Sequence, residues 1–483
     1  MSLSTRGALA WSFAERYVSL AVTIASTMVL ARLLTPAQVG IFSLCAAFTA
    51  IAGILRDFGV SEYLIQEKEL DRDKLRAAFG VAIVIAWTMA AFVYFVRHWI
   101  SAYFGEPGVS DVLAVLSLNF VILPFASPAF ALLNREMAFR KIFLVQTVSN
   151  TVQAATGVGL AYAGYGYMSL AWAPVASIAI QTALLTYLRP RDSLLLPSLK
   201  NSRSILKYGS LFVTSRSVET LTRNAHEFVI AKQFGFASVG LFSRAFGLLE
   251  LFYNNVAAAI LRVATPAFAN NHRAGQELAN AFARGTAIFT CVAWPFFGFV
   301  ALMSSELILL LFGTQWRAAA PIASILALVM MPTYLYALGP NLLSATGHVK
   351  RRLKISLFYS PIHLAGLLAA SFFGLEAIAA IWGCTHLVML TLYCRELKQV
   401  LKQRVRTLFS PSLSSAAISA ACIAVQAAVA YGCRYAALPA LATLSLVATA
   451  TLIVWILLVG AARHPAQEEL ARVLHRVRSG GDA

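Results

Sequence analysis

The chain has 483 residues, of which 59% are hydrophobic and only 12% are charged, whereas a soluble domain usually carries about 25% charged residues. One soluble core could not bury so much apolar side chain, so lipid must be the solvent for part of the chain. The net charge of +18 would suggest a nucleic-acid partner in a soluble protein. In this composition it indicates basic cytoplasmic loops, and no nucleic acid is expected to bind.

The predicted elements, taken in chain order, are fourteen apolar segments, each long enough to cross about 30 Å of hydrocarbon as a helix. They lie near residues 9–31, 40–56, 77–96, 110–133, 142–163, 167–188, 206–231, 237–261, 280–303, 318–344, 353–373, 376–394, 410–431 and 437–460. The first contains Glu15 and Arg16 and lacks a small-residue cleavage site, so we expect a retained helix and not a signal peptide. Residues 465–478 are expected to form a short basic amphipathic helix on anionic lipid.

Basic residues are distributed unevenly between the two sides of this arrangement. With the N-terminus in the cytoplasm, 30 of the 39 Lys and Arg residues fall in cytoplasmic segments, five on the opposite side and four within spans. Cytoplasmic loops of membrane proteins carry an excess of Lys and Arg. The bias therefore predicts an even number of spans with both termini in the cytoplasm.

Two pairs of segments indicate an internal repeat. ARLLTPAQVGIFS at 31–43 resembles AKQFGFASVGLFS at 231–243, and LLNREMAFRK at 132–141 resembles LLSATGHVKR at 342–351. They predict two six-span lobes in the same orientation, residues 1–195 and 196–405, with two appended spans in 406–462 and a cytoplasmic tail at 463–483. Parallel repeats of this kind commonly enclose a central pathway that opens to alternate sides.

Ionisable residues are concentrated in a few of the predicted spans. Segment 206–231 carries Arg216, Glu219, Arg223, His226 and Glu227, which fall within an arc of about 100° on a helix. The first span adds Glu15 and Arg16, and the eighth adds Arg244, Glu250, Asn254 and Asn255. Charges within a membrane are costly and by default indicate function, although such groups can also pair with one another and simply hold helices together.

As a group, these residues favour a hydrated cavity for an anionic, hydroxyl-rich headgroup, because Arg bonds phosphate in bidentate fashion while amides and carboxylates bond sugar hydroxyls. We predict that the substrate is bound by Arg16, Arg216, Arg223, Arg244, Asn254 and Asn255. Candidates for a coupling proton or Na⁺ are Glu15, Glu219, His226, Glu227 and Glu250. His363 and His386 stand alone in the sequence and are interpreted as core histidines.

No catalytic pattern is found in the sequence. It contains no Walker A loop, no metal-ligand spacing and no nucleophile–base arrangement, and the six cysteines show no CxxC spacing. We therefore expect neither an enzyme nor a resident cofactor or metal.

The chain resembles the polysaccharide transporter family of the multidrug/oligosaccharidyl-lipid/polysaccharide exporter superfamily, the Wzx-like flippases. The resemblance runs along the first twelve spans and is carried by residues 31–44, 55–70, 132–143 and 208–245. It implies a V-shaped pair of six-helix lobes that work by alternating access. The implied substrate is an undecaprenyl-pyrophosphate-linked oligosaccharide, flipped to the periplasmic leaflet of the bacterial inner membrane, with a polysaccharide polymerase or export machinery as a further partner.

The resemblance also implies that charged residues on the first, second, seventh and eighth spans hold the headgroup. These match Arg16, Arg216, Arg223 and Arg244, with Glu15, Glu219, Glu227 and Glu250, whereas the second span has no ionisable residue between Ile41 and Leu55. Alternative functions are a lipid II flippase, a cation-coupled drug exporter, or a non-transporting scaffold of a glycan-assembly complex. A charged, hydrated cavity would favour a glycolipid transporter over the last two.

Overall fold

In a computed structural model, the described residues are 5–60, 64, 67, 71–190, 195–200, 203–274 and 276–469, without the side chains of 5–15, 201–212, 214 and 215. The chain divides into two compact units, Met1–Gly240 and Leu241–Ala483. The predicted lobe boundary near residue 195 stays a prediction. The predicted amphipathic helix at 465–478 lies mostly outside the described residues, which end at 469.

Every regular element in these ranges is a helix. Unit 1 contains α1 (Thr5–Leu33), α2 (Pro36–Asp57), α4 (Arg72–Phe104), α5 (Pro107–Arg135), α6 (Phe139–Tyr162), α7 (Tyr167–Leu188) and the first part of α9 (Arg203–Phe252). Unit 2 contains the rest of α9, the π-helical turn η1 (Tyr253–Ala257), α10 (Ala258–Arg273), α11 (Leu278–Phe312), the 3₁₀ turn η2 (Thr314–Trp316), α12 (Ala319–Met330), α13 (Thr333–Tyr336), α14 (Gly339–Ala345), α15 (Val349–Ala370), α16 (Leu375–Leu401), α17 (Val405–Phe409), α18 (Pro411–Tyr435) and α19 (Ala440–Ala461).

Twelve of the described helical segments are long and apolar enough to cross a membrane. This confirms the prediction of a multi-pass, all-helical membrane protein. One segment, Arg216–Arg273, is far longer than a single span needs, and its backbone leaves helical geometry at Gly235, where φ is 78° and ψ is 175°. The count of fourteen spans and the position of both termini stay predictions.

The first repeat forms the same break between helices in both of its copies. In the first copy, Thr35 ends the link after α1 and caps α2: its hydroxyl accepts from the amide of Gln38 (3.3 Å), and its own amide donates to the Gln38 side chain (3.0 Å). In the second copy, Gly235, 200 positions later, breaks α9 with a positive φ that suits a residue without Cβ. The helix is thus interrupted at equivalent positions in both copies, by the capping residue Thr35 in the first and by Gly235 in the second.

α2 crosses the segment of α9 after Gly235 at two buried glycines, Gly40 and Gly240. A Cβ atom added to Gly40 would collide with the carbonyl oxygen of Phe236, and one added to Gly240 would collide with that of Pro36. Since positions 36 and 236 are also 200 apart, the contact is symmetric within the repeat. The shared Val-Gly pair is therefore explained by close backbone packing, which only glycine permits.

The second repeat also has equivalent backbone geometry in its two copies. α5 ends at Arg135 and α14 at Ala345, and in each case a residue with positive φ follows two positions later: Met137 (53°) and Gly347 (78°). In both copies a six-residue hydrogen bond closes the turn, from Ala138 to Leu133 (3.0 Å) and from His348 to Leu343 (2.7 Å). The local folds of the two copies confirm that the sequence echo is structural.

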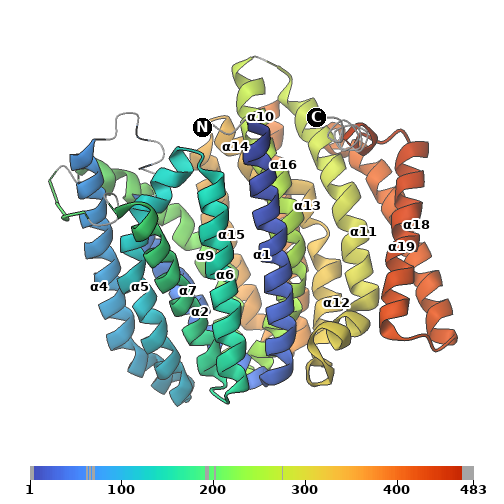
Figure 1. Cartoon of the computed structure of the whole chain (residues 1–483). Coiled ribbons are helices and arrows are strands. Elements are labelled where there is room, and N and C mark those ends of the chain that lie inside the picture. Colours follow the sequence, from blue (N-terminus) through green and yellow to red (C-terminus); the bar gives the residue numbers. More distant parts are fainter. Residues whose placement is uncertain are drawn as a thin grey trace. The chain divides into compact units, whose positions relative to one another are not determined.

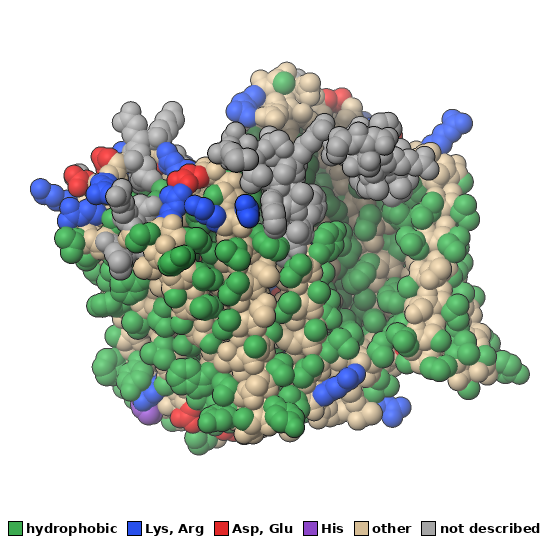
Figure 2. All heavy atoms as spheres, in the orientation of Figure 1, with side chains coloured by type: hydrophobic (Ala, Val, Ile, Leu, Met, Phe, Trp, Pro, Cys, Tyr) green, Lys and Arg blue, Asp and Glu red, His purple; other side chains and the backbone are tan. Residues whose placement is uncertain are grey.

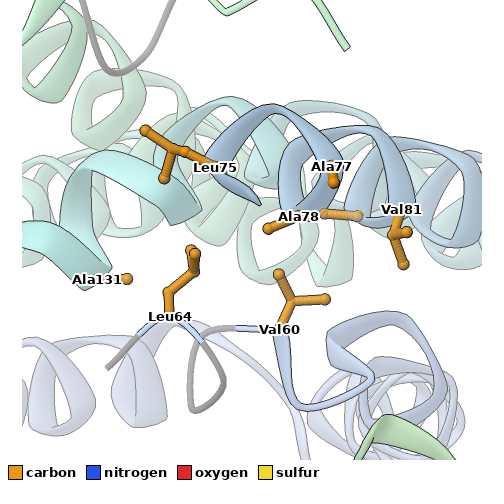
Figure 3. Close-up of a cluster of buried hydrophobic side chains, with 8 residues drawn as sticks. Val60, Leu64, Leu75, Ala77, Ala78, Val81 and Ala131 are labelled. Carbon is orange, nitrogen blue, oxygen red and sulfur yellow. The ribbon is translucent and has the colours of Figure 1, made fainter. Parts of the chain in front are cut away.

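In unit 1, α4, α5 and α7 are successive neighbours, and α6 and α1 continue the row (Figure 1). The chain that follows α2 is fixed to this row by a buried apolar cluster, in which Val60 and Leu64 point toward α4 (Figure 3). The cluster consists of Val60, Leu64, Leu75, Ala77, Ala78, Val81, Ala82 and Ala131. Small residues on α4 let the connecting chain approach closely.

Basic segments that are far apart in sequence meet at one end of unit 1. Arg135 donates to the carbonyl of Leu64 (2.9 Å), Arg76 donates to that of Leu196 (3.0 Å), and the amide of Ser198 donates to the carbonyl of Arg76 (3.1 Å). In the left part of Figure 2, which shows α4 to α7, Lys and Arg side chains gather at the upper edge above an apolar flank. Segments predicted to share one side of the membrane therefore share one end of this unit.

In unit 2, the appended helices α18 and α19 are anchored on α11 at Pro295. Proline has no N–H, so the carbonyl four residues earlier, at Cys291, loses its helical donor. Trp455 of α19 donates its indole N–H to that carbonyl (2.8 Å), and Gln426 of α18 donates to the carbonyl of Pro295 (3.0 Å). Polar side chains of the appended helices thus satisfy the backbone groups of a proline-containing span.

Candidate functional site

The charged face predicted between Arg216 and Glu227 lies on one continuous helix, the first part of α9. Arg216 and Arg223 are exposed and Glu219 is half-buried, whereas His226 and Glu227 are only 3% and 7% exposed. We call these five residues the α9 charged face. Its exposed guanidinium groups can bind an anion, and its buried end can hold a proton or a cation.

His226 and Glu227 form a buried pair at that end. The distance from His226 Nε2 to Glu227 Oε1 is 3.6 Å, and Glu227 Oε2 is buried with no hydrogen-bond partner in the described part of the chain. α2 packs at the next position, where the rings of Phe48 and Phe228 lie 4.6 Å apart. Since a buried carboxylate oxygen without a donor is costly, Glu227 has the capacity to take up a proton or a cation.

The first span contributes less to this picture. Arg16 is half-buried on α1, and Glu15 lies in the same helix, but its side chain is outside the described residues. One turn further along, the Ser19 hydroxyl accepts a hydrogen bond from the side-chain amide of Asn150 on α6 (2.8 Å). Polar side chains of α1 therefore also join helices within unit 1.

Arg244 lies on the part of α9 that belongs to unit 2 and contacts two aromatic rings. Its guanidinium carbon is 5.3 Å from the ring of Trp316 and 5.7 Å from that of Phe312. Trp316 is fully buried, and Arg244 Nε is buried with no hydrogen-bond partner among the residues described. Aromatic faces stabilise such a cation. Arg244 thus has an aromatic environment that differs from that of the exposed Arg216 and Arg223.

Asn254 and Asn255 lie on η1, a π-helical turn where a continuous α-helix was expected. Asn254 is exposed, and Glu250, one turn earlier, is half-buried. The side-chain amide of Asn255 donates to the backbone carbonyl of Leu251 (2.8 Å). A π-helical turn is an irregularity that often occurs at functional sites, because it redirects side chains.

Sequence reasoning missed one polar cluster. His363 on α15 and His386 on α16 are buried, as expected, but they are not isolated, because the Nδ1 atom of each lies 3.3 Å from the Tyr359 hydroxyl. The signal was present: the two histidines lie 11 residues before and 12 residues after Gly374, in the turn between the two helices. A hairpin of two helices brings such positions to the same level.

An apolar cavity of about 360 Å³ lies between α11 and α19 in unit 2. Its lining side chains are almost entirely hydrophobic: Val292, Pro295, Phe296, Phe299, Ala448, Thr451, Leu452 and Trp455. A cavity of this composition suits a hydrocarbon chain and offers little to a charged or hydroxylated group.

Residues 29–321 match the model of the family described as polysaccharide biosynthesis protein. The chain belongs to this family. It is 22% identical over 324 residues to the lipopolysaccharide biosynthesis protein WzxC of Escherichia coli (strain K12), a match that covers 66% of this chain and 65% of WzxC. It is 23% identical over 319 residues to the succinoglycan biosynthesis transport protein ExoT of Rhizobium meliloti (strain 1021), covering 66% of this chain and 64% of ExoT.

The matches to these relatives therefore span just under two thirds of their length. A third relative is the teichuronic acid biosynthesis protein TuaB of Bacillus subtilis (strain 168), 21% identical over 58% of this chain and 59% of TuaB. Together with the family match, these relatives confirm the predicted resemblance to Wzx-like proteins.

Solved structures of the same fold cover most of the chain. The lipid II flippase MurJ, in an inward closed conformation, aligns over 93% of this chain and 98% of its own with a TM-score of 0.75 at 13% identity. A multidrug resistance MATE family transporter of the MOP superfamily, inward-facing, aligns over 80% of this chain and 95% of its own with a TM-score of 0.61 at 14% identity. These similarities show that this chain has the fold of the two solved structures.

Proposed function

We propose that this protein is a flippase that moves an undecaprenyl-pyrophosphate-linked oligosaccharide, a precursor of exopolysaccharide or O-antigen, across the bacterial inner membrane. The observation that carries the proposal is the α9 charged face, which places five ionisable residues within the predicted seventh span, at the start of the long candidate segment Arg216–Arg273. Charges in such a position are rare, and they face protein or water where they serve a transported substrate. A scaffold would gain nothing from them.

The chemistry of the α9 charged face suits a pyrophosphate headgroup. Arg216 and Arg223 lie two turns apart, and both are exposed, so each guanidinium can form two parallel hydrogen bonds to a phosphate group. Arg16 and Arg244 are further cationic candidates, and the amides of Asn254 and Asn255 suit sugar hydroxyls. The prenyl chain can stay in lipid.

In this proposal the chain crosses the membrane fourteen times, with both termini in the cytoplasm. The long segment Arg216–Arg273 counts as two spans because it is divided at Gly235. The 24-residue helix α6, which packs between α1 and α7, adds one more, since it is about 36 Å long. The clustering of basic segments at one end of unit 1 supports a common cytoplasmic side.

Transport would proceed by alternating access, coupled to H⁺ or Na⁺. The candidates for binding the coupling ion are Glu15, Glu219, His226, Glu227 and Glu250, and the uncompensated oxygen of Glu227 supports a site at the buried end of the α9 charged face. The names of WzxC, ExoT and TuaB, which refer to polysaccharide biosynthesis and transport, support a polymerase or an export complex as the partner that takes up the product.

The experiment that tests this proposal is deletion of the gene, followed by mass spectrometry of lipid-linked oligosaccharides with labelling of the exposed leaflet. We expect one complete glycolipid to accumulate on the cytoplasmic leaflet, surface polymer to be lost, and both effects to be reversed by the wild-type gene. Accumulation of lipid II would instead indicate a lipid II flippase. The similarity to MurJ concerns the fold and does not by itself favour that substrate. Unchanged polymer with no trapped glycolipid, in a strain without related flippases, would contradict the proposal.

A further inference from the structure

Four polar side chains meet near the middle of two neighbouring helices in unit 2. Tyr359 and His363 are one turn apart on α15, and Thr385 and His386 are adjacent on α16. All four are buried, with exposures of 6%, 1%, 3% and 9%, respectively. We call these four residues the histidine-pair cluster. Both helices are candidate membrane spans, so the cluster lies within the apolar part of the protein.

The hydrogen-bond distances define the direction of the bonds at His363. The Thr385 hydroxyl is 3.0 Å from the carbonyl oxygen of Ile381 and donates to it. Toward His363 Nδ1, which lies 2.9 Å from the same hydroxyl, Thr385 must therefore accept. In the neutral cluster His363 consequently carries its proton on Nδ1.

The same reasoning leaves one ring nitrogen of His386 available. The Tyr359 hydroxyl lies 3.3 Å from Nδ1 of both histidines and 3.5 Å from the Thr385 oxygen, and because His363 Nδ1 already carries a proton, the single hydrogen of the hydroxyl points to Thr385 or to His386 Nδ1. An added proton can occupy His386 Nδ1, after which the Tyr359 oxygen accepts and its own hydrogen rotates away. One hydroxyl can thus serve as donor in the neutral cluster and as acceptor in the charged one.

The contacts described around the two imidazoles are aromatic and include no carboxylate. Trp382 packs edge-on to both histidines, at 5.0 Å from His363 and 5.5 Å from His386, and the Tyr359 ring stacks on His363 at 5.4 Å. A cation is stabilised when it lies over the face of an aromatic ring within about 6 Å, and the Tyr359 ring presents its face to His363. The indole of Trp382 therefore contacts both histidines and encloses one side of the cluster.

Among the contacts described, the titratable side chain of a neighbouring element that touches the cluster is a tyrosine, and α17, at the far end of α16, carries Arg406. Among the helices that pack against α15 and α16, α12 and α14 contain no titratable side chain, and α13 contributes Tyr336, whose ring is 6.4 Å from His386 and stacks on Tyr393 of α16. α9 contributes the apolar ring of Phe246, 5.1 Å from Trp382, and carries the charged residues Arg244 and Glu250 two and four positions from that ring.

Charged residues lie farther along the two helices. On α15 they are in the first turns, where Arg351 pairs with Glu396 of α16 (2.8 Å). On α16, Glu376 and Glu396 are each ten residues from His386, which is about 15 Å along a helix.

We propose that the histidine-pair cluster is the proton-binding site that couples export to the proton gradient. The inference rests on the flippase function proposed above and names its coupling ion. A hard cation such as Na⁺ favours several oxygen ligands, whereas the groups of this cluster that can gain charge are imidazoles, whose ring nitrogens bind a proton. One proton from the periplasmic side binds His386 Nδ1 to form an imidazolium, and the same proton is released to the cytoplasm when the protein changes state. The residues of the α9 charged face are then left to bind the glycolipid.

The test uses the full-length protein in liposomes, with the glycolipid isolated from the deletion strain as the probe. Membrane potential is held at zero with K⁺ and valinomycin, and glycolipid in each leaflet is measured with and without a pH difference of one unit. One proton per glycolipid can drive at most about a tenfold accumulation per pH unit. The wild type should approach that ratio, and without a gradient it should equilibrate the leaflets.

The variants His386→Gln and Tyr359→Phe should equilibrate the leaflets at near the wild-type rate but lose gradient-driven accumulation. Their retained equilibration shows that they are folded, and His272→Gln, an exposed histidine at the end of α10, is the matched control that should keep accumulation. Accumulation that persists in both variants would overturn the proposal, as would a wild-type protein that equilibrates glycolipid without regard to pH. Failure of the wild type to move glycolipid at all would overturn the flippase function itself, and the proton site with it.

Discussion

The α9 charged face and the histidine-pair cluster are two polar regions within apolar helices, and they differ in how they are built. The α9 charged face comes from a single helix, and its five ionisable residues are graded from exposed Arg216 to buried Glu227. The histidine-pair cluster comes from two helices, and its members are uniformly buried and bonded to one another. An exposed face suits a large anionic ligand, whereas an enclosed cluster suits a proton.

This difference separates the two tasks of a coupled transporter. Guanidinium groups must be reachable by a headgroup, so they stay accessible. A coupling proton must not leak, so its site is better enclosed by packed side chains. The predictions that follow test whether the two regions divide the tasks in this way.

The largest effect is expected from Gly40→Leu. The α9 charged face keeps its place beside α2 through the crossing at Gly40 and Gly240, where any Cβ would collide with a backbone carbonyl. Overpacking of a close contact costs about 1–3 kcal/mol or more. We expect a lower melting temperature and no restoration of polymer in the deletion strain. Gly159→Leu on α6, where nothing lies within 4 Å, is the control and should behave as wild type. Normal export by Gly40→Leu would show that the crossing does not support the α9 charged face.

The next largest effect is expected from Arg216→Gln and Arg223→Gln. Each removes a charge-assisted hydrogen bond worth about 1.5–3 kcal/mol, so glycolipid equilibration in liposomes should fall by about tenfold or more. The proteins should remain folded, because both side chains are exposed. Arg97→Gln, at the other end of unit 1 where Arg97 lies 3.9 Å from the ring of Tyr94, makes the same chemical change away from the α9 charged face. Equal equilibration rates in all three variants would show that the headgroup does not bind at the α9 charged face.

A smaller effect is expected from Glu227→Gln, and it decides between the two candidate coupling sites. If the histidine-pair cluster binds the coupling proton, Glu227→Gln should retain gradient-driven accumulation to within about twofold of wild type, against a limit of about tenfold per pH unit. The same liposome assay measures it beside His386→Gln. Loss of accumulation in Glu227→Gln but not in His386→Gln would move coupling to the buried end of the α9 charged face.

The smallest effect concerns His464, a buried histidine just after α19. Its Nε2 lies 3.0 Å from the Ser415 hydroxyl, its Nδ1 accepts from the amide of Ala466 (3.1 Å), and burial lowers the pKa of its imidazole below the usual 6.5. Because the unfolded state then binds the proton more readily, stability should fall as the pH drops below about 6.5. The melting temperature should decrease modestly between pH 7.5 and 5.5, and His464→Gln should reduce that decrease. An equal pH dependence of the melting temperature in the wild type and in His464→Gln would show that protonation of His464 does not contribute to the loss of stability.

Much of the architecture could be predicted because it depends on local chemistry. The apolar segments predicted the helices, and the spacing of Arg216, Arg223 and Glu227 placed them on one face of α9. The repeat at 31–43 and 231–243 also predicted equivalent structures, and the break at Thr35 and Gly235 confirms it. Each of these signals lies within one helix or one turn, where geometry fixes which residues are neighbours.

The remaining features required tertiary packing. His363 and His386 are 23 residues apart, and nothing in their own segments shows that the Tyr359 hydroxyl lies between them. The aromatic environment of Arg244 depends on Trp316, more than 70 positions away. Such contacts depend on how two helices are rotated against each other, which periodicity within either helix does not specify.

The sequence by itself determined that this protein is a helical membrane protein with charged groups on defined helix faces, because hydropathy and the period of 3.6 residues act locally. Tertiary structure alone decided which charged groups are exposed and which are enclosed. It also decided why glycine stands at positions 40 and 240, because two backbones meet there. Burial and close approach are properties of pairs of helices, so they first exist when the helices pack.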